Sequence, residues 1–319
     1  MYSKLKILTG NANTELAYAV SEYADLPLSK RELFKFSNDN SFVKIMENVR
    51  GFDVFVIQPT CKPVNDNLME LLIMIDALRR ASAARITAVI PYFAYARSDK
   101  KDQPRVPITA KLVANLLTTA GANRIITFDL HAQQVQGFFD IPVDHLSMLP
   151  IFLKYFKSLN LKNVVIVSPD TGGTDRARWF AQQLDANIAI GDKRRIGNDG
   201  KVEILRIVGD VEKKIAIIVD DIIDSAKSTV KMARALQDNN AAKIFCACTH
   251  PVLSGKAVDR INNSPIDECV VTDSIPLNEA AKKSKKIKQL SIASLLAQAI
   301  KRIHNEETVS VLFKIRNED

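Results

Sequence analysis

Short apolar runs alternate with amphipathic segments along the chain. The apolar runs predict buried strands, and apolar residues that recur every three to four positions predict helices. The expected strands are Asp53–Ile57, Ile86–Ile90, Arg124–Phe128, Asn163–Val167, Ile188–Ile190, Ile215–Val219, Ile244–Ala247 and Cys269–Thr272. The expected helices are Asn65–Ala81, Thr109–Ala120, Met148–Leu159, Asp175–Leu184 and Val230–Asn239. This alternation predicts an α/β protein with mainly parallel sheets flanked by helices.

The same order of segments occurs twice. The first copy runs from DVFVIQP (53–59) through a helix to TAVIPYF (87–93), and the second from IAIIVDD (215–221) through a helix to FCACTHP (245–251). A duplicated domain is the simplest explanation of such a repeat. We therefore expect two tandem domains, residues 1–147 and 148–319, with the last ~20 residues packing back on the first domain.

Composition narrows the class of protein. The 319 residues are 47% hydrophobic and 25% charged, as in globular proteins, which argues against disorder or a fibre. No apolar segment is long enough to span a bilayer, and the N-terminus lacks the apolar core of a signal peptide. We therefore expect a cytoplasmic protein with no membrane partner. The four cysteines, Cys61, Cys246, Cys248 and Cys269, show no metal-ligand spacing. Cys246 and Cys248 would share one face of a strand and are expected in the core.

The net charge of +8 suits a phosphate-rich substrate and a nucleic acid equally well. A lysine cluster at 282–288 favours nucleic acid at first sight, but no aromatic residues are interleaved with it. Such runs are more often solvated surface. We therefore expect no nucleic-acid partner; one would show strongly salt-dependent binding.

Acidic and small polar residues follow the expected strand at 215–219. Asp220 and Asp221 close the strand, Asp224 follows three residues later, and a polar loop, Ser225–Thr229, leads into a helix. Carboxylates in this position can hold the hydroxyls of a sugar, and the hydroxyls and N–H groups at a helix start can receive a phosphate. An ordinary capped turn would explain a lone Ser-Thr pair. It does not explain three acids and a polar loop of this length.

Other expected strands also end in chemically useful residues. His131 follows one strand in an Asp-Leu-His sequence that suits a metal or phosphate site, although a lone histidine is usually structural. Asp170 follows another, beside Gly172 and Gly173, which permit φ > 0 and let backbone amides approach an anion. Tyr92–Arg105 carries four cations after a third strand. Each cluster alone is explained by a surface loop or a tight turn, but ligands of parallel sheets bind beyond the carboxyl ends of the strands.

Together these segments closely resemble the ribose-phosphate pyrophosphokinase family. The matching stretches follow one another from about residue 5 to 315, and a chance match of this length is not credible. They include NDNLMELLIMIDALRRASA (65–83), DLHAQQVQGFFDIPVDHL (129–146), SPDTGGTDRARWFA (168–181) and VDDIIDSA (219–226).

The resemblance implies two tandem type I phosphoribosyltransferase-like domains assembled into hexamers built from dimers. It also implies an activity. With Mg²⁺, the diphosphoryl group of ATP is transferred to the anomeric hydroxyl of ribose 5-phosphate, which gives AMP and 5-phosphoribosyl 1-diphosphate for nucleotide biosynthesis. Because the transferred group is a polyanion, the protein's task is mainly positioning and charge neutralisation.

The resemblance further implies roles for single residues. The catalytic cations are Lys193 and Arg195, in the expected loop GDKRR. The metal or its water shell contacts His131 and Asp170, of which the carboxylate suits Mg²⁺ better than the imidazole does. ATP contacts Phe36, Asn38, Asp39, Asn40, Arg97 and Ser98, with Phe36 beside the adenine of a neighbouring subunit. Ribose 5-phosphate contacts Arg195, Asp220, Asp221, Asp224, Ser225, Ala226, Lys227 and Ser228.

Three segments depart from the family's usual pattern. Phe-Ser-Asp-Gly-Glu is usual where this chain has Phe36-Ser37-Asn38-Asp39-Asn40, and Arg-Gln is usual where it has Arg97-Ser98. Lys227 stands where a glycine is usual. If that position needs φ > 0, the lysine costs roughly 1 kcal/mol or more, while its ammonium gains from a nearby phosphate.

These departures keep two alternatives open. The first is a non-catalytic or weakened regulatory paralogue that binds nucleotide or sugar phosphate. The second is a phosphoribosyltransferase that consumes phosphoribosyl diphosphate, which the tandem domains fit poorly. The retained set His131, Asp170, Lys193, Arg195 and Asp220 favours the enzyme.

Overall fold

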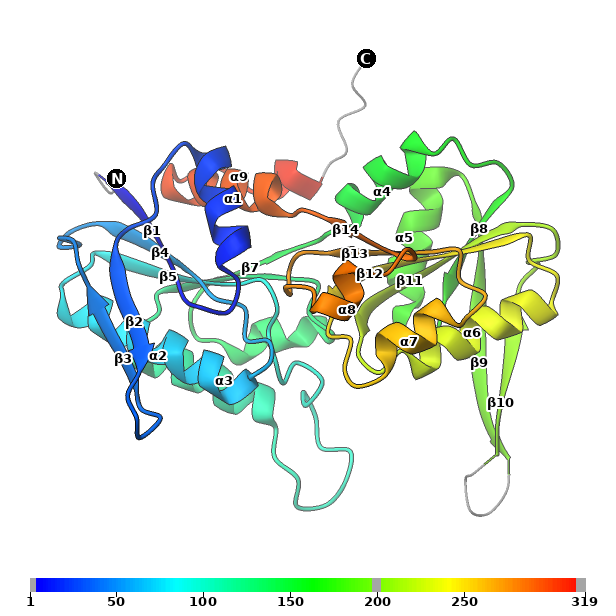
Figure 1. Ribbon diagram of the computed structural model, residues 1–319, viewed down its shortest axis with the longest axis horizontal. Coiled ribbons are helices and arrows are strands. Elements are labelled where there is room, and N and C mark those ends of the chain that lie inside the picture. Colours follow the sequence, from blue (N-terminus) through cyan, green and yellow to red (C-terminus); the bar gives the residue numbers. More distant parts are fainter. Residues whose placement is uncertain (1–3, 197–201, 314–319) are drawn as a thin grey trace. The chain divides into compact units, whose positions relative to one another are not determined.

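The computed structural model describes residues 4–196 and 202–313 (Figure 1). The described chain divides into two compact units. The first contains residues 4–147, 274–276 and 291–313, and the second contains residues 148–196, 202–273 and 277–290. No helix among these residues combines the length and the apolar character needed to cross a membrane.

The first unit is a parallel sheet with helices on both faces (Figure 1). Its strands lie in the order β1-β4-β5-β6-β7, and each neighbouring pair is parallel. Helices α1 and α9 pack together on one face, and α2 and α3 on the other. The strands are β1 Leu5–Thr9, β2 Arg31–Lys35, β3 Ser41–Ile45, β4 Asp53–Ile57, β5 Arg85–Ile90, β6 Arg124–Phe128 and β7 Val143–Leu146; the helices are α1 Thr14–Ala24, α2 Val64–Arg80, α3 Thr109–Ala120 and α9 Ala293–His304.

The second unit has the same kind of architecture. Its strand order is β10-β9-β8-β11-β12-β13-β14, with the β9–β10 pair antiparallel and the other neighbours parallel. The strands are β8 Val164–Ser168, β9 Asn187–Ile196, β10 Val202–Val208, β11 Ile215–Ile223, β12 Lys243–Pro251, β13 Glu268–Thr272 and β14 Ile287–Leu290; the helices are α4 Leu149–Ser158, α5 Thr174–Leu184, α6 Lys227–Asp238, α7 Ala257–Asn262 and α8 Glu279–Lys282.

The two units repeat one topology. The order β1-β4-β5-β6-β7 in the first unit corresponds to β8-β11-β12-β13-β14 in the second. In each unit the first of these strands is followed by a helix and an antiparallel strand pair, β2–β3 in one unit and β9–β10 in the other. The repeat that the sequence shows around β4 and β11 is therefore part of a longer structural repeat, which supports a duplicated domain.

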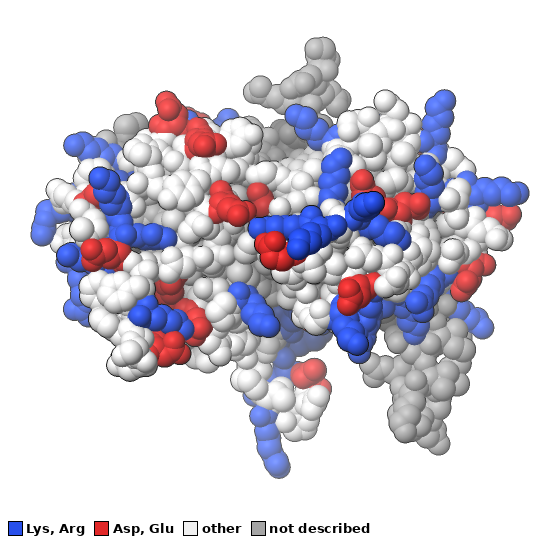
Figure 2. Space-filling view, viewed as in Figure 1, with Lys and Arg blue, Asp and Glu red and all other residues white. Residues whose placement is uncertain are grey.

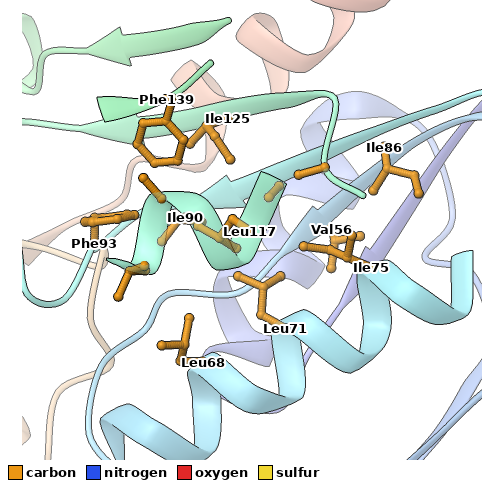
Figure 3. Close-up of a cluster of buried hydrophobic side chains, with 14 of the residues drawn as sticks. Val56, Leu68, Leu71, Ile75, Ile86, Ile90, Phe93, Leu117, Ile125 and Phe139 are labelled. Carbon is orange, nitrogen blue, oxygen red and sulfur yellow. The ribbon is translucent and has the colours of Figure 1, made fainter. Parts of the chain in front are cut away.

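Apolar side chains fill the space between the first sheet and helices α2 and α3 (Figure 3). Leu71 and Ile75 lie four residues apart on α2, so they share the helix face that meets Val56 and Ile90 of the sheet. These side chains are fully buried, and each contributes about 1.5–3 kcal/mol of apolar burial. The packing fixes both helices, and with them the loops at the carboxyl edge of the sheet.

Helix α9 is attached to the first unit by a buried ionic cluster. Asp53, at the start of β4, is fully buried and pairs with Arg85 at the start of β5. His304 Nδ1 lies 2.9 Å from the Asp53 carboxylate, and Arg85 Nη2 donates to the Ile303 carbonyl at 3.1 Å. A segment far along the sequence thus completes the packing of the first sheet.

The predicted strands and helices recur with most ends shifted by one or two residues, and three of the strands were predicted too short. β9 continues to Ile196, β11 to Ile223 and β12 to Pro251. The prediction of a loop at Gly191–Arg195 was therefore wrong, because these residues pair with β10. Polar side chains at strand ends hide the extension from a pattern based on apolar runs. Cys246 and Cys248 are buried thiols, as predicted, and Cys61 and Cys269 are buried as well.

Candidate active site

The turn between β11 and α6 differs from the loop that the sequence predicts. Asp220 and Asp221 lie within the last residues of β11 and not after the strand. Lys227 and Ser228 belong to the first turn of α6. Ala226 is the N-cap of the helix with φ 59°, in the left-handed region, whereas Lys227 is helical. The expected backbone strain at Lys227 is therefore absent.

The start of α6 presents N–H groups to solvent. The Val230 N–H donates to the Ala226 carbonyl at 3.0 Å as the first bond of the helix, and no side chain caps the helix. The N–H groups that precede this bond have no acceptor within the helix, and the helix dipole places partial positive charge there. This end of α6 can therefore receive an anion such as a phosphate.

The segment that follows β12 holds this turn in place. The Ser254 N–H donates to the Asp224 carbonyl at 2.9 Å, and the Ser254 hydroxyl bonds the Asp224 carboxylate. Arg260, on α7, donates from Nη1 to the Ser225 carbonyl at 2.7 Å. The shape of the turn therefore depends on side chains about 30 residues further along the chain.

Asp220 and Asp221 form a carboxylate pair with one cation beside them. Arg176, from α5, lies 3.2 Å from Asp221 Oδ1 and 4.0 Å from Asp220 Oδ1. The Asp221 N–H donates to Asp220 Oδ1 at 2.9 Å. Burial and the neighbouring Asp221 carboxylate raise the pKa of Asp220 to about 8. In the ligand-free protein the Asp220 proton and the Arg176 guanidinium share the pair, and the hydroxyl donors or the cation of a ligand can take the place of the proton.

Asp220→Asn is expected to stabilise the ligand-free protein at alkaline pH. The raised pKa means that folded protein keeps the Asp220 proton up to about pH 8, whereas unfolded protein loses it near pH 4. Wild-type stability therefore falls between these values as pH rises. We expect the variant to melt at least about 2–4 °C higher at pH 8, which is the shift that each kcal/mol produces in a domain of this size. Thermal melts at pH 5 should show a smaller difference, and a constant difference would contradict the assignment.

Asp170 lies two residues after the end of β8 and caps the short helical turn that follows. Its Oδ1 accepts from the Gly172 N–H at 3.0 Å and from the Gly173 N–H at 3.3 Å. Neither glycine adopts the positive φ that it permits. A Cβ on Gly173 would lie 2.8 Å from Ser168 Oγ, so a larger residue at 173 would have to displace this hydroxyl. The anion that the two amides approach is the Asp170 carboxylate itself.

The predicted catalytic cations, Lys193 and Arg195, have their backbone in β9, opposite Leu205 and Glu203 of β10. Their side chains lie outside the part of the chain that the structure describes. The β9–β10 pair is the counterpart, in the second unit, of the β2–β3 hairpin.

His131 is exposed just beyond β6 in the first unit. Asp129, the first residue after the strand, has φ 32°, which is an uncommon backbone conformation for a residue other than glycine. The next N–H, of Leu130, donates to His145 Nε2 at 2.8 Å. His145 on β7 thus fixes the sharp exit of β6 that leaves His131 at the carboxyl edge of the sheet. His131 and Asp170, the predicted metal residues, belong to different units.

Arg97 and Ser98 lie between β5 and α3, where Arg97 is exposed. The Ser98 hydroxyl accepts from the Thr109 N–H at 3.3 Å, and the Ser98 carbonyl accepts from the Ala110 N–H at 3.2 Å. Ser98 therefore supports the start of α3. This bond gives the short hydroxyl side chain a structural role at a position where the family usually has glutamine.

The β2–β3 hairpin carries an exposed aromatic cluster. The Phe36 ring packs edge-on against Phe34 at 5.1 Å and Phe42 at 5.7 Å between centroids, yet Phe36 remains 49% exposed. Asp39 has φ 69° in the hairpin turn, and its carboxylate pairs with Lys35. Asp39 occupies the position of the family's usual glycine and keeps the left-handed conformation that a glycine would adopt.

Family models match both parts of the chain. The model described as the N-terminal domain of ribose phosphate pyrophosphokinase matches residues 5–121, and that described as the phosphoribosyl synthetase-associated domain matches residues 200–314. A ribose-phosphate pyrophosphokinase of Caldanaerobacter subterraneus subsp. tengcongensis is 55% identical over 312 residues, which cover 98% of each chain. One of Neisseria meningitidis serogroup A is 52% identical over 98% of this chain and 95% of its own. The chain belongs to the ribose-phosphate pyrophosphokinase family.

A solved structure of a family member has the same fold. The crystal structure of phosphoribosylpyrophosphate synthetase from Mycobacterium smegmatis matches with a TM-score of 0.90 and 40% identity, over 95% of this chain and 100% of that chain. The prediction of helix-flanked, mainly parallel sheets in a phosphoribosyltransferase-like protein is confirmed.

Three contributors to this candidate site were not predicted. Arg176 lies in the matched segment 168–181 but was assigned only to a helix. Ser254 and Arg260 lie outside the quoted motifs. Arg176 was open to prediction, because its helix follows the Asp170 turn and begins at the same sheet edge as the acids of β11. Ser254 and Arg260 were not, because a bond to a backbone carbonyl depends on tertiary packing alone.

Proposed function

We propose that this chain is a ribose-phosphate diphosphokinase, which makes 5-phosphoribosyl 1-diphosphate and AMP from ATP and ribose 5-phosphate. One observation carries the proposal. The Asp220–Asp221 pair ends a strand directly before a helix start whose N–H groups are available to an anion. A sugar phosphate needs acceptors for its hydroxyls and donors for its phosphate, and this turn offers both. Membership of the family supports the same activity.

In this proposal the turn holds the sugar at both ends. The carboxylates of Asp220 and Asp221 accept hydrogen bonds from the ribose hydroxyls. The backbone and hydroxyls of residues 224–228 bind the 5-phosphate. Hydrogen bonds to charged groups contribute about 1.5–3 kcal/mol each, which is enough to discriminate against sugars without these groups. Arg176 keeps the carboxylate pair oriented.

The transfer itself is a displacement at phosphorus. The anomeric hydroxyl oxygen bonds to the β-phosphorus of ATP, the bond from that phosphorus to the α–β bridging oxygen breaks, AMP leaves, and the hydroxyl proton passes to water. Developing negative charge must be neutralised by cations. We assign this task to Lys193 and Arg195, and ATP binding to Arg97 and the hairpin around Phe36.

We further propose Mg²⁺ as the cofactor, with Asp170 and His131 facing the metal or its water shell. Carboxylate oxygens and water are the ligands that Mg²⁺ prefers, often with substrate phosphates completing the shell. Among the described residues, no three His, Cys, Asp or Glu side chains gather as a metal site. This fits a metal held largely by the phosphates of ATP. The bound ion would neutralise phosphate charge.

One assay tests the proposed function against the regulatory paralogue. Purified protein with ATP and Mg²⁺ should release AMP when ribose 5-phosphate is added, and not when ribose replaces it. Each AMP should be matched by one phosphoribosyl diphosphate. Nucleotide binding without AMP release would favour the regulatory paralogue, and AMP release without sugar would contradict the assignment.

We also propose a cytoplasmic homo-oligomer, a hexamer built from dimers, with no nucleic-acid or membrane partner. The exposed aromatic cluster on the β2–β3 hairpin supports a protein contact in the first unit. Sedimentation of the purified protein tests this proposal, since a stable monomer at micromolar concentration would rule it out.

A further inference from the structure

A basic groove runs between α6 and α7 in the second unit. Its cavity volume is about 520 Å³, and five of its eight lining residues are Lys or Arg. Asp259 is the only acid among the described residues that line it. Figure 2 shows Lys and Arg side chains gathered on the surface over these two helices. The lining residues are Lys227, Val230, Lys231, Arg234, Lys256, Asp259, Arg260 and Asn263.

The cations of this α6–α7 groove are poorly compensated by the protein. Lys227, Lys231 and Arg234 follow one another along one side of α6 at spacings of four and three residues, which brings like charges together. In the described part of the chain, Lys227, Arg234 and Lys256 form no ion pair or side-chain hydrogen bond. The groove therefore has excess positive charge that an anionic ligand would neutralise.

The spacing of the cations selects the size of the anion. Seven residues separate Lys227 from Arg234, which corresponds to about 10 Å along a helix. A single phosphate group can contact cations at both ends of this span only if their side chains bend toward one another. A chain of linked phosphate groups is long enough, and each phosphate adds charge-assisted hydrogen bonds to Lys and Arg.

Arg260 connects the groove with residues 224–228, which follow β11 and include the first residues of α6, here named the sugar-phosphate turn after its proposed ligand. It lines the groove, and its Nη1 donates to the Ser225 carbonyl at 2.7 Å. The guanidinium is half-buried. An anion that binds Arg260 from the groove competes with this carbonyl, because a phosphate oxygen is the stronger acceptor. Loss of the Ser225 bond would loosen the turn.

We propose that the α6–α7 groove binds an oligophosphate, free or as the tail of a nucleotide, at a site that adjoins the turn between β11 and α6 and shares Lys227 with it. The bound anion weakens ribose 5-phosphate binding by drawing Arg260 away from Ser225. This second part rests on the proposed function. By linkage, ribose 5-phosphate must weaken the oligophosphate by the same factor.

Direct binding tests the groove independently of activity. Inorganic tripolyphosphate is titrated calorimetrically into the full-length protein with ribose 5-phosphate and a non-hydrolysable ATP analogue saturating the active site. The double substitution Arg234→Gln and Lys256→Gln should weaken binding about tenfold with kcat unchanged. The matched control, Lys154→Gln with Lys243→Gln, removes two exposed lysines elsewhere in this unit and should bind like wild type. Equal loss in both variants, or in neither, overturns the site.

Two further arms test the source of the anion and the coupling. Titration with GTP in place of tripolyphosphate distinguishes the two sources of the anion. Equal affinity means that the protein recognises the phosphates alone, and tighter binding of GTP means that it recognises a nucleotide. Tripolyphosphate should raise KM for ribose 5-phosphate about threefold in wild type. In the Arg260→Gln variant, KM for ribose 5-phosphate should be higher than in wild type without tripolyphosphate, and it should not change when tripolyphosphate is added. A response that persists in Arg260→Gln overturns the coupling. If the protein shows no turnover at all, the proposed function is contradicted. The calorimetric comparison of the two double variants still tests whether the groove binds the oligophosphate.

Discussion

Asp220→Ala is expected to raise KM for ribose 5-phosphate by about 10- to 100-fold, which corresponds to losing one hydrogen bond to a charged group. The Asp220 side chain is 19% exposed, at the end of β11, so substrate can reach it. KM for ATP should change by less than about threefold, because the acid is assigned to the sugar. Steady-state kinetics with each substrate varied in turn measure both values.

The control for this experiment is Asp238→Ala. Asp238 is an exposed acid at the opposite end of α6, so its removal changes the net charge equally without touching the turn. Both KM values should stay near those of wild type. If Asp220→Ala weakened ATP as much as ribose 5-phosphate, the carboxylate would act through a shared metal or through the fold and not through the ribose hydroxyls.

The central strands of the sheets could be predicted from the sequence because buried parallel strands are nearly continuous apolar runs. β4 and β6 begin and end where the sequence places them, since both faces of these strands are covered. The β2–β3 hairpin was missed for the opposite reason. RELFK and SFVKI are short and half-exposed, and their charged residues break the apolar pattern.

The site was predicted less completely than the fold. Acids at strand ends are visible in the sequence, but the conformation of each residue is not. The structure puts the left-handed residue of the turn between β11 and α6 at Ala226, so the condition under which Lys227 would be strained is not met. Because Lys227 lies in the first turn of α6, its side chain lines the α6–α7 groove. A shift of one residue thus changes the environment of this cation.

Contacts between distant segments could not be predicted from the sequence. His145 shapes the exit of β6, and Arg260 bonds the turn after β11, each through a backbone group. A backbone acceptor or donor is present at every residue, so no residue type in the partner segment signals the bond. Such positioning residues are found only when the packing of β7 and α7 is known.

Lys193→Ala is expected to lower kcat by about 10²- to 10³-fold, the effect of removing one donor that stabilises transition-state charge. Affinity for ribose 5-phosphate should change little, because the sugar is assigned to the turn after β11. The reason lies in the reaction. Charge on the transferring phosphates redistributes only as the bond to AMP breaks, so a cation that meets it there acts on turnover and not on ground-state binding.

Two companion variants make the test of Lys193 decisive. Lys193→Arg keeps the positive charge and should recover part of the lost kcat, although guanidinium and ammonium differ in geometry. Lys154→Ala removes an exposed lysine of α4 and should leave kcat unchanged. Single-turnover measurements of AMP formation separate the chemical step from product release. If Lys193→Ala turned over near the wild-type rate, or lost affinity for ribose 5-phosphate in proportion to kcat, Lys193 would have no specific role in the transfer, and neutralisation of the phosphates would fall to Arg195 and the metal.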